Sequence, residues 1–130
     1  MKPIRIFISS VQQEFAKERK LLADYIRQDA LLGQFFEAFI FEKTSAKDKS
    51  VQKVYSEGVE QSDIYLGLLG SQYGYEDAEG VSPTEREYDI ATAANKNRLI
   101  FIKETDNRHS KETAFIRKAK RSASSCTVPA

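Results

Sequence analysis

One segment of the chain combines the signals of a helix start with a glutamate that is a candidate catalytic residue. Ser82, Pro83 and Glu85 have the residue types of an N-cap, a first helical position and a third helical position. Glu87 follows just past this first turn, where the helix dipole favours an ionised carboxylate by a few tenths of a kcal/mol up to about 1 kcal/mol. An ionised carboxylate fixed in a crevice is what attack at a sugar anomeric carbon, or stabilisation of an oxocarbenium ion, requires. The alternative is a solvated surface acid, because Glu85 and Glu87 flank Arg86.

Two serines and an aspartate at the ends of strand-like runs are candidate ligand-binding residues. Ser9 and Ser10 directly follow the apolar run at residues 4–8, where their hydroxyls could hold a ribose or a phosphate. Asp63 comes just before the apolar run at residues 64–69, so it belongs to the amino end of that strand. For Asp63 the alternative is a turn or capping role.

The segment at residues 70–81 is a loop rich in glycine, tyrosine and acid. Gly70 begins a Gly-Ser-Gln-Tyr-Gly run, but no Gly-Lys-Ser/Thr follows, so the loop is not a P-loop. It could still offer backbone N–H groups to an anion. Tyr73 and Tyr75 could stack on a base or a nicotinamide ring, or they could pack the loop against the domain.

Short apolar runs alternate with amphipathic helices along the chain. Strands are predicted at residues 4–8, 35–41, 64–69 and 99–102, and helices from Ser10, from Ser50, from Ser82 and over about residues 111–120. This alternation predicts an α/β fold with a parallel sheet. We expect a flavodoxin-like three-layer sandwich of four to five strands in the order 2-1-3-4, because the first and third runs are the most apolar and belong in the centre. Nothing after Ile102 is a candidate for a fifth strand, so one domain over residues 1–120 and a disordered tail over 121–130 are expected.

The first predicted helix turns an apolar face toward the sheet. Ser10 and Gln13 have the spacing of a capping box, and the apolar face consists of Val11, Phe15, Leu22 and Ile26. Glu18 falls on that face, which is unusual for an acid. We expect Glu18 to lie at the edge of the face, paired with Arg19 or another base.

In open parallel sheets, ligands bind outside the carboxyl ends of the strands, where the strand order reverses. For the order 2-1-3-4, this switch point lies between the first and third strands. Ser9, Ser10, the loop from Gly70 to Tyr75 and the helix that begins at Ser82 then meet at one rim. The predicted topology therefore gathers hydroxyls, glycines, tyrosines and carboxylates at one place.

The composition argues against several classes of protein. Of 130 residues, 41% are hydrophobic and 30% are charged, which suits a folded domain, and the formal net charge is +1. This balance argues against nucleic-acid binding, so the basic stripe at residues 117–121 is either a solvated helix end or a contact for an acidic partner or nucleic acid. A single cysteine, Cys126, and a single histidine, His109, disfavour a disulfide framework, a metal site and a Ser-His-Asp triad, and no cofactor is expected. No apolar run nears the roughly 20 residues that span a bilayer and no signal peptide is visible, so we expect a cytoplasmic protein without membrane contact.

Several linked segments resemble the DUF4062 family. They are Phe7–Gln12 with Glu14, Phe15, Glu18 and Arg19, then Ser62–Gly70 with Tyr73 and Gly74, then Ser82–Tyr88, and last Phe101–Lys103. The resemblance runs from about Ile4 to Lys103. Because members of this family usually stand at the N-terminus of longer bacterial proteins, ahead of NTPase, repeat or DNA-binding modules, it implies a sensing or effector module of a larger signalling, regulatory or defence protein.

The DUF4062 domain is similar to the wider TIR and nucleoside deoxyribosyltransferase-like group, whose enzymes cleave N-glycosidic bonds of nucleosides or NAD through a glutamate. This similarity implies the nucleophile role for Glu87, with Thr84 three residues before it. It also implies ligand-site roles for Asp63, in the Ser-Asp pair before the central strand, and for Ser9 after the first strand.

Two functions are consistent with these observations. The first is binding of a nucleotide or NAD-like ligand at the switch point, with N-glycosidic cleavage by Glu87 as its sharper form. The expected ligand-binding residues are Ser9, Ser10, Asp63, Gly70, Tyr73, Tyr75 and Thr84. The second function is a non-catalytic module that self-associates or binds a partner, which an exposed apolar flank near Leu99 to Ile102 would favour.

Overall fold

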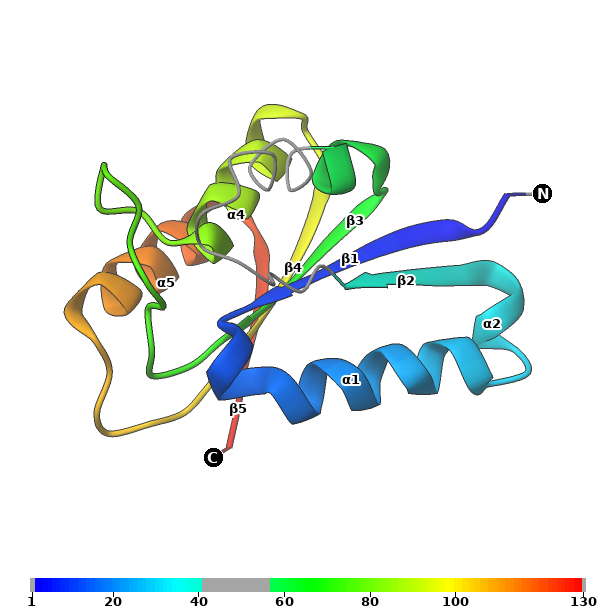
Figure 1. Cartoon of the computed structure of the whole chain (residues 1–130), viewed down its shortest axis with the longest axis horizontal. Helices are drawn as coiled ribbons and strands as arrows, with labels where there is room; N and C mark the ends of the chain where they lie inside the picture. Colours follow the sequence, from blue (N-terminus) through cyan, green and yellow to red (C-terminus); the bar gives the residue numbers. More distant parts are fainter. Residues whose placement is uncertain (1, 41–56, 130) are drawn as a thin grey trace.

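A computed structural model describes residues 2–40 and 57–129 as an α/β domain built on one parallel sheet (Figure 1). The strands are β1 (Ile4–Ser10), β2 (Phe36–Ile40), β3 (Ile64–Leu69), β4 (Asn97–Lys103) and β5 (Ser124–Val128). They are hydrogen-bonded in the order β2-β1-β3-β4-β5, and every neighbouring pair is parallel. The predicted fold class and the order 2-1-3-4 are confirmed, with β5 added beyond β4.

Helices cover both faces of this sheet (Figure 1). They are α1 (Gln12–Gln28), the short α2 (Leu32–Phe35), α4 (Pro83–Ala93) and α5 (Ser110–Ser122), with a further helical stretch at residues 57–61. Ala23 and Ile26 of α1 pack with Ile6 and Ile8 on one face of the sheet. Side chains of α4 and α5 pack with Phe7 and the other inward side chains of the opposite face. The predicted helix start at Ser50 lies outside the described residues.

The strand β5 corrects the expectation of a disordered tail at residues 121–130. Its residues pair with β4 from Leu99 opposite Ser124 to Lys103 opposite Val128. Four of its five residues are exposed. An edge strand that buries little surface needs no apolar run, which is why the polar segment did not resemble a strand. The helix α5 also continues through Ser122, into the segment expected to be disordered.

The beginning of α1 also differs from the prediction. Ser10 is the last residue of β1 and pairs with Leu68, so it cannot serve as the helix N-cap. Val11 occupies that position, and no side chain of the described residues caps it. Phe15 has non-helical dihedral angles that bend the helix after its first turn. Arg19, rather than Glu18, is the charged residue on the buried face.

The helix α4 starts as its sequence predicts. Ser82 is the N-cap, Pro83 follows it, and the Ser82 hydroxyl accepts a hydrogen bond from the Glu85 N–H at 3.2 Å. The Ser82 N–H donates to the phenol oxygen of Tyr73 at 3.2 Å, which ties the helix start to the loop after β3. This capped start determines where the following turns of α4 meet the sheet. Within the described residues, none of the helices has the length and apolar character that a membrane crossing requires.

Candidate active site

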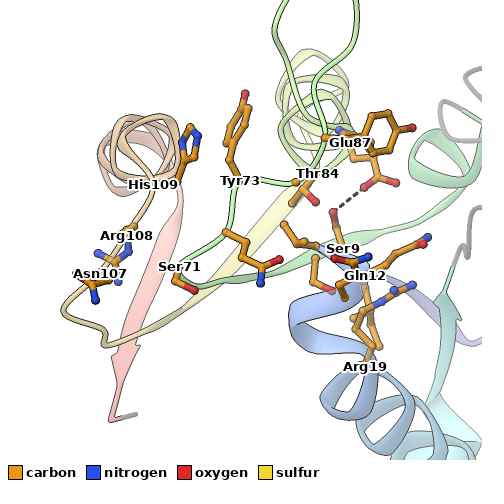
Figure 2. A pocket seen from close by; sticks show the side chains of 18 of the residues that line it. Ser9, Gln12, Arg19, Ser71, Tyr73, Thr84, Glu87, Asn107, Arg108 and His109 are labelled. Atoms are coloured by element: carbon orange, nitrogen blue, oxygen red, sulfur yellow. Dashed lines mark hydrogen bonds between the residues drawn. The ribbon is translucent and has the colours of Figure 1, made fainter. Parts of the chain in front are cut away.

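A cavity of about 850 Å³ opens at the carboxyl ends of β1 and β3 (Figure 2). This is the switch point of the strand order, where ligands bind in open α/β sheets, and the volume is in the usual range for ligand pockets. Its lining comes from the end of β1, the start of α1, the loops after β3 and β4, and the start of α4. Among the lining residues are Ser9, Ser10, Gln12, Arg19, Ser71, Tyr73, Tyr75, Thr84, Glu87, Asn107, Arg108 and His109.

Glu87 is a buried carboxyl group that faces this cavity from α4. Only 5% of the residue is exposed, and the Ser9 hydroxyl of β1 donates a 2.7 Å hydrogen bond to its Oε1 (Figure 2). Thr84 lies one helical turn earlier, on the same face of α4, and it also lines the cavity. The prediction that Ser9, Thr84 and Glu87 meet at the switch point is confirmed, and the alternative of Glu87 as a solvated surface acid is wrong.

The environment of Glu87 favours its protonated form. Burial raises the pKa of Glu87 to about 8, although the Ser9 hydrogen bond and the positive charge of Arg19 both act to lower it. The nearby phenol Tyr65 is fully buried as well, and burial together with the Glu87 charge raises the pKa of Tyr65. A carboxyl group whose pKa is displaced this far inside a pocket is a candidate for acid–base or nucleophilic chemistry.

The two candidate tyrosines have different surroundings. Tyr73 is buried, its hydroxyl donates to Glu85 Oε1, and its ring stacks on the His109 ring with centroids 5.8 Å apart (Figure 2). These contacts make Tyr73 a residue that packs the loop against α4 and α5. Tyr75 lines the cavity with 49% of its surface exposed, so it is the tyrosine better placed to meet a base.

Asp63 and Gly70 do not line the cavity. Asp63 is at the amino end of β3, where its Oδ2 accepts the Arg5 N–H at 2.9 Å, so the turn or capping role is the one observed. Gly70 directly follows β3, and its missing side chain leaves room for the Glu14 carboxylate. The structure therefore does not bring Asp63 and Gly70 together with the other predicted residues: Asp63 lies at the amino end of β3, away from the carboxyl ends where the cavity opens, and Gly70 lies against Glu14.

Two charged residues that were not predicted as site residues, Glu14 and Arg108, hold the cavity walls together. The Glu14 carboxylate accepts hydrogen bonds from the Ser71 N–H, the Ser71 hydroxyl and the Gln72 N–H at 2.7 to 2.9 Å. Burial raises the pKa of Glu14, but these hydrogen bonds outweigh it, and the pKa is lowered overall. Arg108 donates to the carbonyl oxygens of Gly70 and Lys103 and so joins the loops after β3 and β4.

Arg19 and His109 are further lining residues outside the predicted set. Arg19 is only 3% exposed, and its place four residues after Phe15 on the buried face of α1 was the signal available in the sequence. His109, which the sequence offered only as an argument against a metal site and a triad, is the N-cap of α5, and its Nδ1 accepts the Lys111 N–H at 3.0 Å. In the part of the chain that the structure describes, no group of three or more His, Cys, Asp or Glu residues could hold a metal ion.

With this fold and site, the chain belongs to the family described as "Domain of unknown function (DUF4062)", whose model matches residues 5–125. The match extends into β5. No curated protein matches the chain. Among solved structures, the chain is similar to the CMP N-glycosidase BcmB of Clostridium botulinum, with a TM-score of 0.58 and 13% identity over 97% of this chain and 88% of that chain. At this identity the likeness establishes a shared fold.

The raised pKa of Glu87 predicts a stability that falls with pH. The folded protein keeps the proton up to about pH 8, whereas the unfolded chain releases it near the ordinary value of 4.5. The contribution of Glu87 to the free energy of unfolding therefore decreases between about pH 4.5 and pH 8, by at most about 1.4 kcal/mol per pH unit. Above about pH 8 this contribution no longer changes with pH. Replacing Glu87 by Gln keeps the acceptor for Ser9 and removes this loss, so the variant gains stability over the wild type as the pH rises.

Urea unfolding of both proteins from about pH 5 to pH 9 measures this difference. Burial also raises the pKa of Glu112 in α5 to about 8, and Glu112 does not line the cavity. Glu112→Gln is therefore a matched comparison, because it removes the pH dependence that another buried carboxyl group gives to the free energy of unfolding. A wild-type minus Glu87→Gln difference that does not change with pH would contradict the buried, protonated state of Glu87.

Proposed function

We propose that this domain binds a nucleotide-like ligand at the switch-point cavity and cleaves its N-glycosidic bond through Glu87. The observation that carries the proposal is the buried Glu87 carboxyl group, held by Ser9 inside a cavity of nucleotide size. The shared fold with a CMP N-glycosidase supports it, because that fold accommodates such chemistry in another protein. As part of this proposal, the domain belongs to the TIR and nucleoside deoxyribosyltransferase-like group. It acts as a sensing or effector module of a larger bacterial protein.

The chemistry requires Glu87 in its ionised form. The carboxylate attacks C1′ or stabilises the positive charge that develops there, the C1′–N bond breaks, and its electron pair leaves with the base, which takes up a proton. Water then completes hydrolysis at C1′. Because the pKa of Glu87 is raised to about 8, roughly a tenth of the sites are ionised at about pH 7 in the absence of ligand. Positive charge that develops at C1′ stabilises the ionised carboxylate. The buried site therefore stabilises the ionised form of Glu87 more in the transition state than when the site is empty.

The remaining lining residues suit a ligand with a sugar and a base. Tyr75 offers an exposed ring at the rim, and Asn107 offers an amide. Ser9 and Thr84 place hydroxyls beside Glu87, where the sugar would lie. The Glu14 carboxylate, which accepts a hydrogen bond from the Ser71 N–H, and Arg108, which donates to the Gly70 carbonyl oxygen, hold these walls in place.

Incubation of the full chain with CMP, NAD and a panel of nucleosides tests the proposal, with released base measured by chromatography. We expect base release from at least one substrate, a rate that rises with pH up to about 8, and a loss of about 100-fold or more in Glu87→Gln. Glu18→Gln, which alters an exposed glutamate on α1, serves as the matched control and keeps the wild-type rate. No release from any substrate, or equal release by Glu87→Gln, would refute catalysis by Glu87.

An exposed apolar strip on β4 supports a second candidate function. Leu99 and Phe101 are 38% and 37% exposed, whereas Ile100 and Ile102, which alternate with them, are buried against the α4 and α5 side. The strip therefore lies on the α1 face of the sheet, where the buried core involves β1, β2 and β3. A strip of this kind suits self-association or the docking of a partner.

Sedimentation over a range of concentrations tests this second candidate. If the strip mediates self-association, the wild-type chain associates as its concentration rises and Phe101→Ser stays monomeric. Leu31→Ser, which alters another exposed apolar residue in the turn before α2, serves as control and associates like the wild type. A wild-type chain that stays monomeric at every concentration would exclude self-association through this strip.

A further inference from the structure

The start of α1 opens into the cavity. Val11, Gln12 and Gln13 all line it, and the N-cap residue Val11 has no side-chain cap among the described residues. The first N–H groups of a helix have no carbonyl partner within that helix, and they carry partial positive charge. A helix start with this exposure to a cavity attracts an anion. Glu14, the acid of this first turn, is engaged by hydrogen bonds from Ser71 and Gln72.

The Ser10 hydroxyl is a second and independent sign of a ligand at this point. Ser10 is 8% exposed, lines the cavity, and its Oγ is buried with no hydrogen-bond partner among the described residues. Leaving a buried hydroxyl without a partner is destabilising, so native structures rarely keep one without a reason. A ligand oxygen at the start of α1 would supply the missing partner.

Arg19 brings a full positive charge to the same region. It is buried on α1, it lines the cavity, and in Figure 2 its side chain extends from the helix toward Ser9 and Gln12. Its charge reaches Glu87, because it acts to lower the pKa of Glu87 against the larger effect of burial. A guanidinium group is suited to phosphate because its planar N–H groups match the geometry of two phosphate oxygens.

Ser9 and Ser10 divide the cavity between the two faces of the sheet. Successive side chains of a strand point to opposite faces. Ser9 contacts Glu87 on the α4 side, whereas Ser10 pairs with Leu68, whose side chain packs on the α1 side. The reacting carboxyl group and the positively charged end are thus adjacent but separate, with the end of β1 between them.

We propose that Ser10, Arg19 and the start of α1 form a subsite for the phosphate group of a nucleotide. The substrate class is then nucleotides rather than nucleosides, with the phosphate on the α1 side of β1 and the sugar carbon C1′ on the Glu87 side. This inference rests on the proposed function for the identity of the whole ligand. The subsite itself is testable with phosphate alone.

The first experiment titrates the full ¹⁵N-labelled chain with inorganic phosphate and follows its amide signals by NMR. We expect saturable shifts at residues 10–13, and a dissociation constant about 3- to 30-fold weaker in Ser10→Ala and in Arg19→Gln. Lys17→Gln removes an equal charge from an exposed position on α1 and changes the constant by less than about twofold. Ser10→Ala removes a hydroxyl that has no hydrogen-bond partner in the part of the chain that the structure describes, so this variant keeps the test decisive if Arg19→Gln does not fold. Shifts that do not saturate, or that spare residues 10–13, would overturn the subsite.

The second experiment compares CMP with cytidine by calorimetry on the same proteins. We expect CMP to bind about 10-fold or more tightly than cytidine, and the ratio to approach one in Ser10→Ala and Arg19→Gln. Equal affinities in the wild type would overturn the assignment of the substrate class. Saturable phosphate binding at residues 10–13 without binding of either CMP or cytidine would support the subsite and refute the proposed nucleotide site, so the two failures are distinguishable.

Discussion

The hydrogen bond between Ser9 and Glu87 joins the first strand to a helix 78 residues later in the chain, and it sets the character of the site. It fixes a carboxyl group where little water reaches it, and such a group is stable only when it is neutral or when positive charge lies nearby. Arg19 supplies part of that charge. A ligand whose sugar becomes positively charged during reaction would supply more. The same burial that favours the protonated form in the empty pocket therefore favours the chemistry proposed for it.

The position of this carboxyl group depends on how the surrounding loops are held. Ser82 caps α4 and bonds to Tyr73, which fixes the helix turn that carries Thr84 and Glu87. Glu14 holds the loop after β3 against α1, and Arg108 holds it against the loop after β4. Charged side chains thus bind backbone groups of distant segments and keep the cavity walls in place before a ligand arrives. On this view, removing Glu14 or Arg108 would disturb the site indirectly.

Much of the fold and the centre of the site could be predicted from local patterns. The apolar runs located four strands, and the Ser-Pro-Thr-Glu start of α4 located the helix that carries Glu87. The reversal of strand order then brought Ser9 to the face of α4 that carries Thr84 and Glu87. By contrast, β5 escaped prediction because an exposed edge strand can be polar, and Ser10 resembled a helix cap although it belongs to the sheet. The roles of Glu14 and Arg108 could not be predicted, because their partners are 57 and 38 residues away and no local sequence pattern indicates them.

The role of Glu87 is tested most directly by a pH titration of its side-chain carboxyl carbon, followed by ¹³C NMR with and without CMP. Its signal is assigned by its absence from Glu87→Gln. The account predicts a midpoint near pH 8 in the free protein and a midpoint displaced by CMP. A midpoint near the ordinary value of 4.5 that CMP leaves unchanged would contradict both the buried state of this carboxyl group and its contact with a nucleotide.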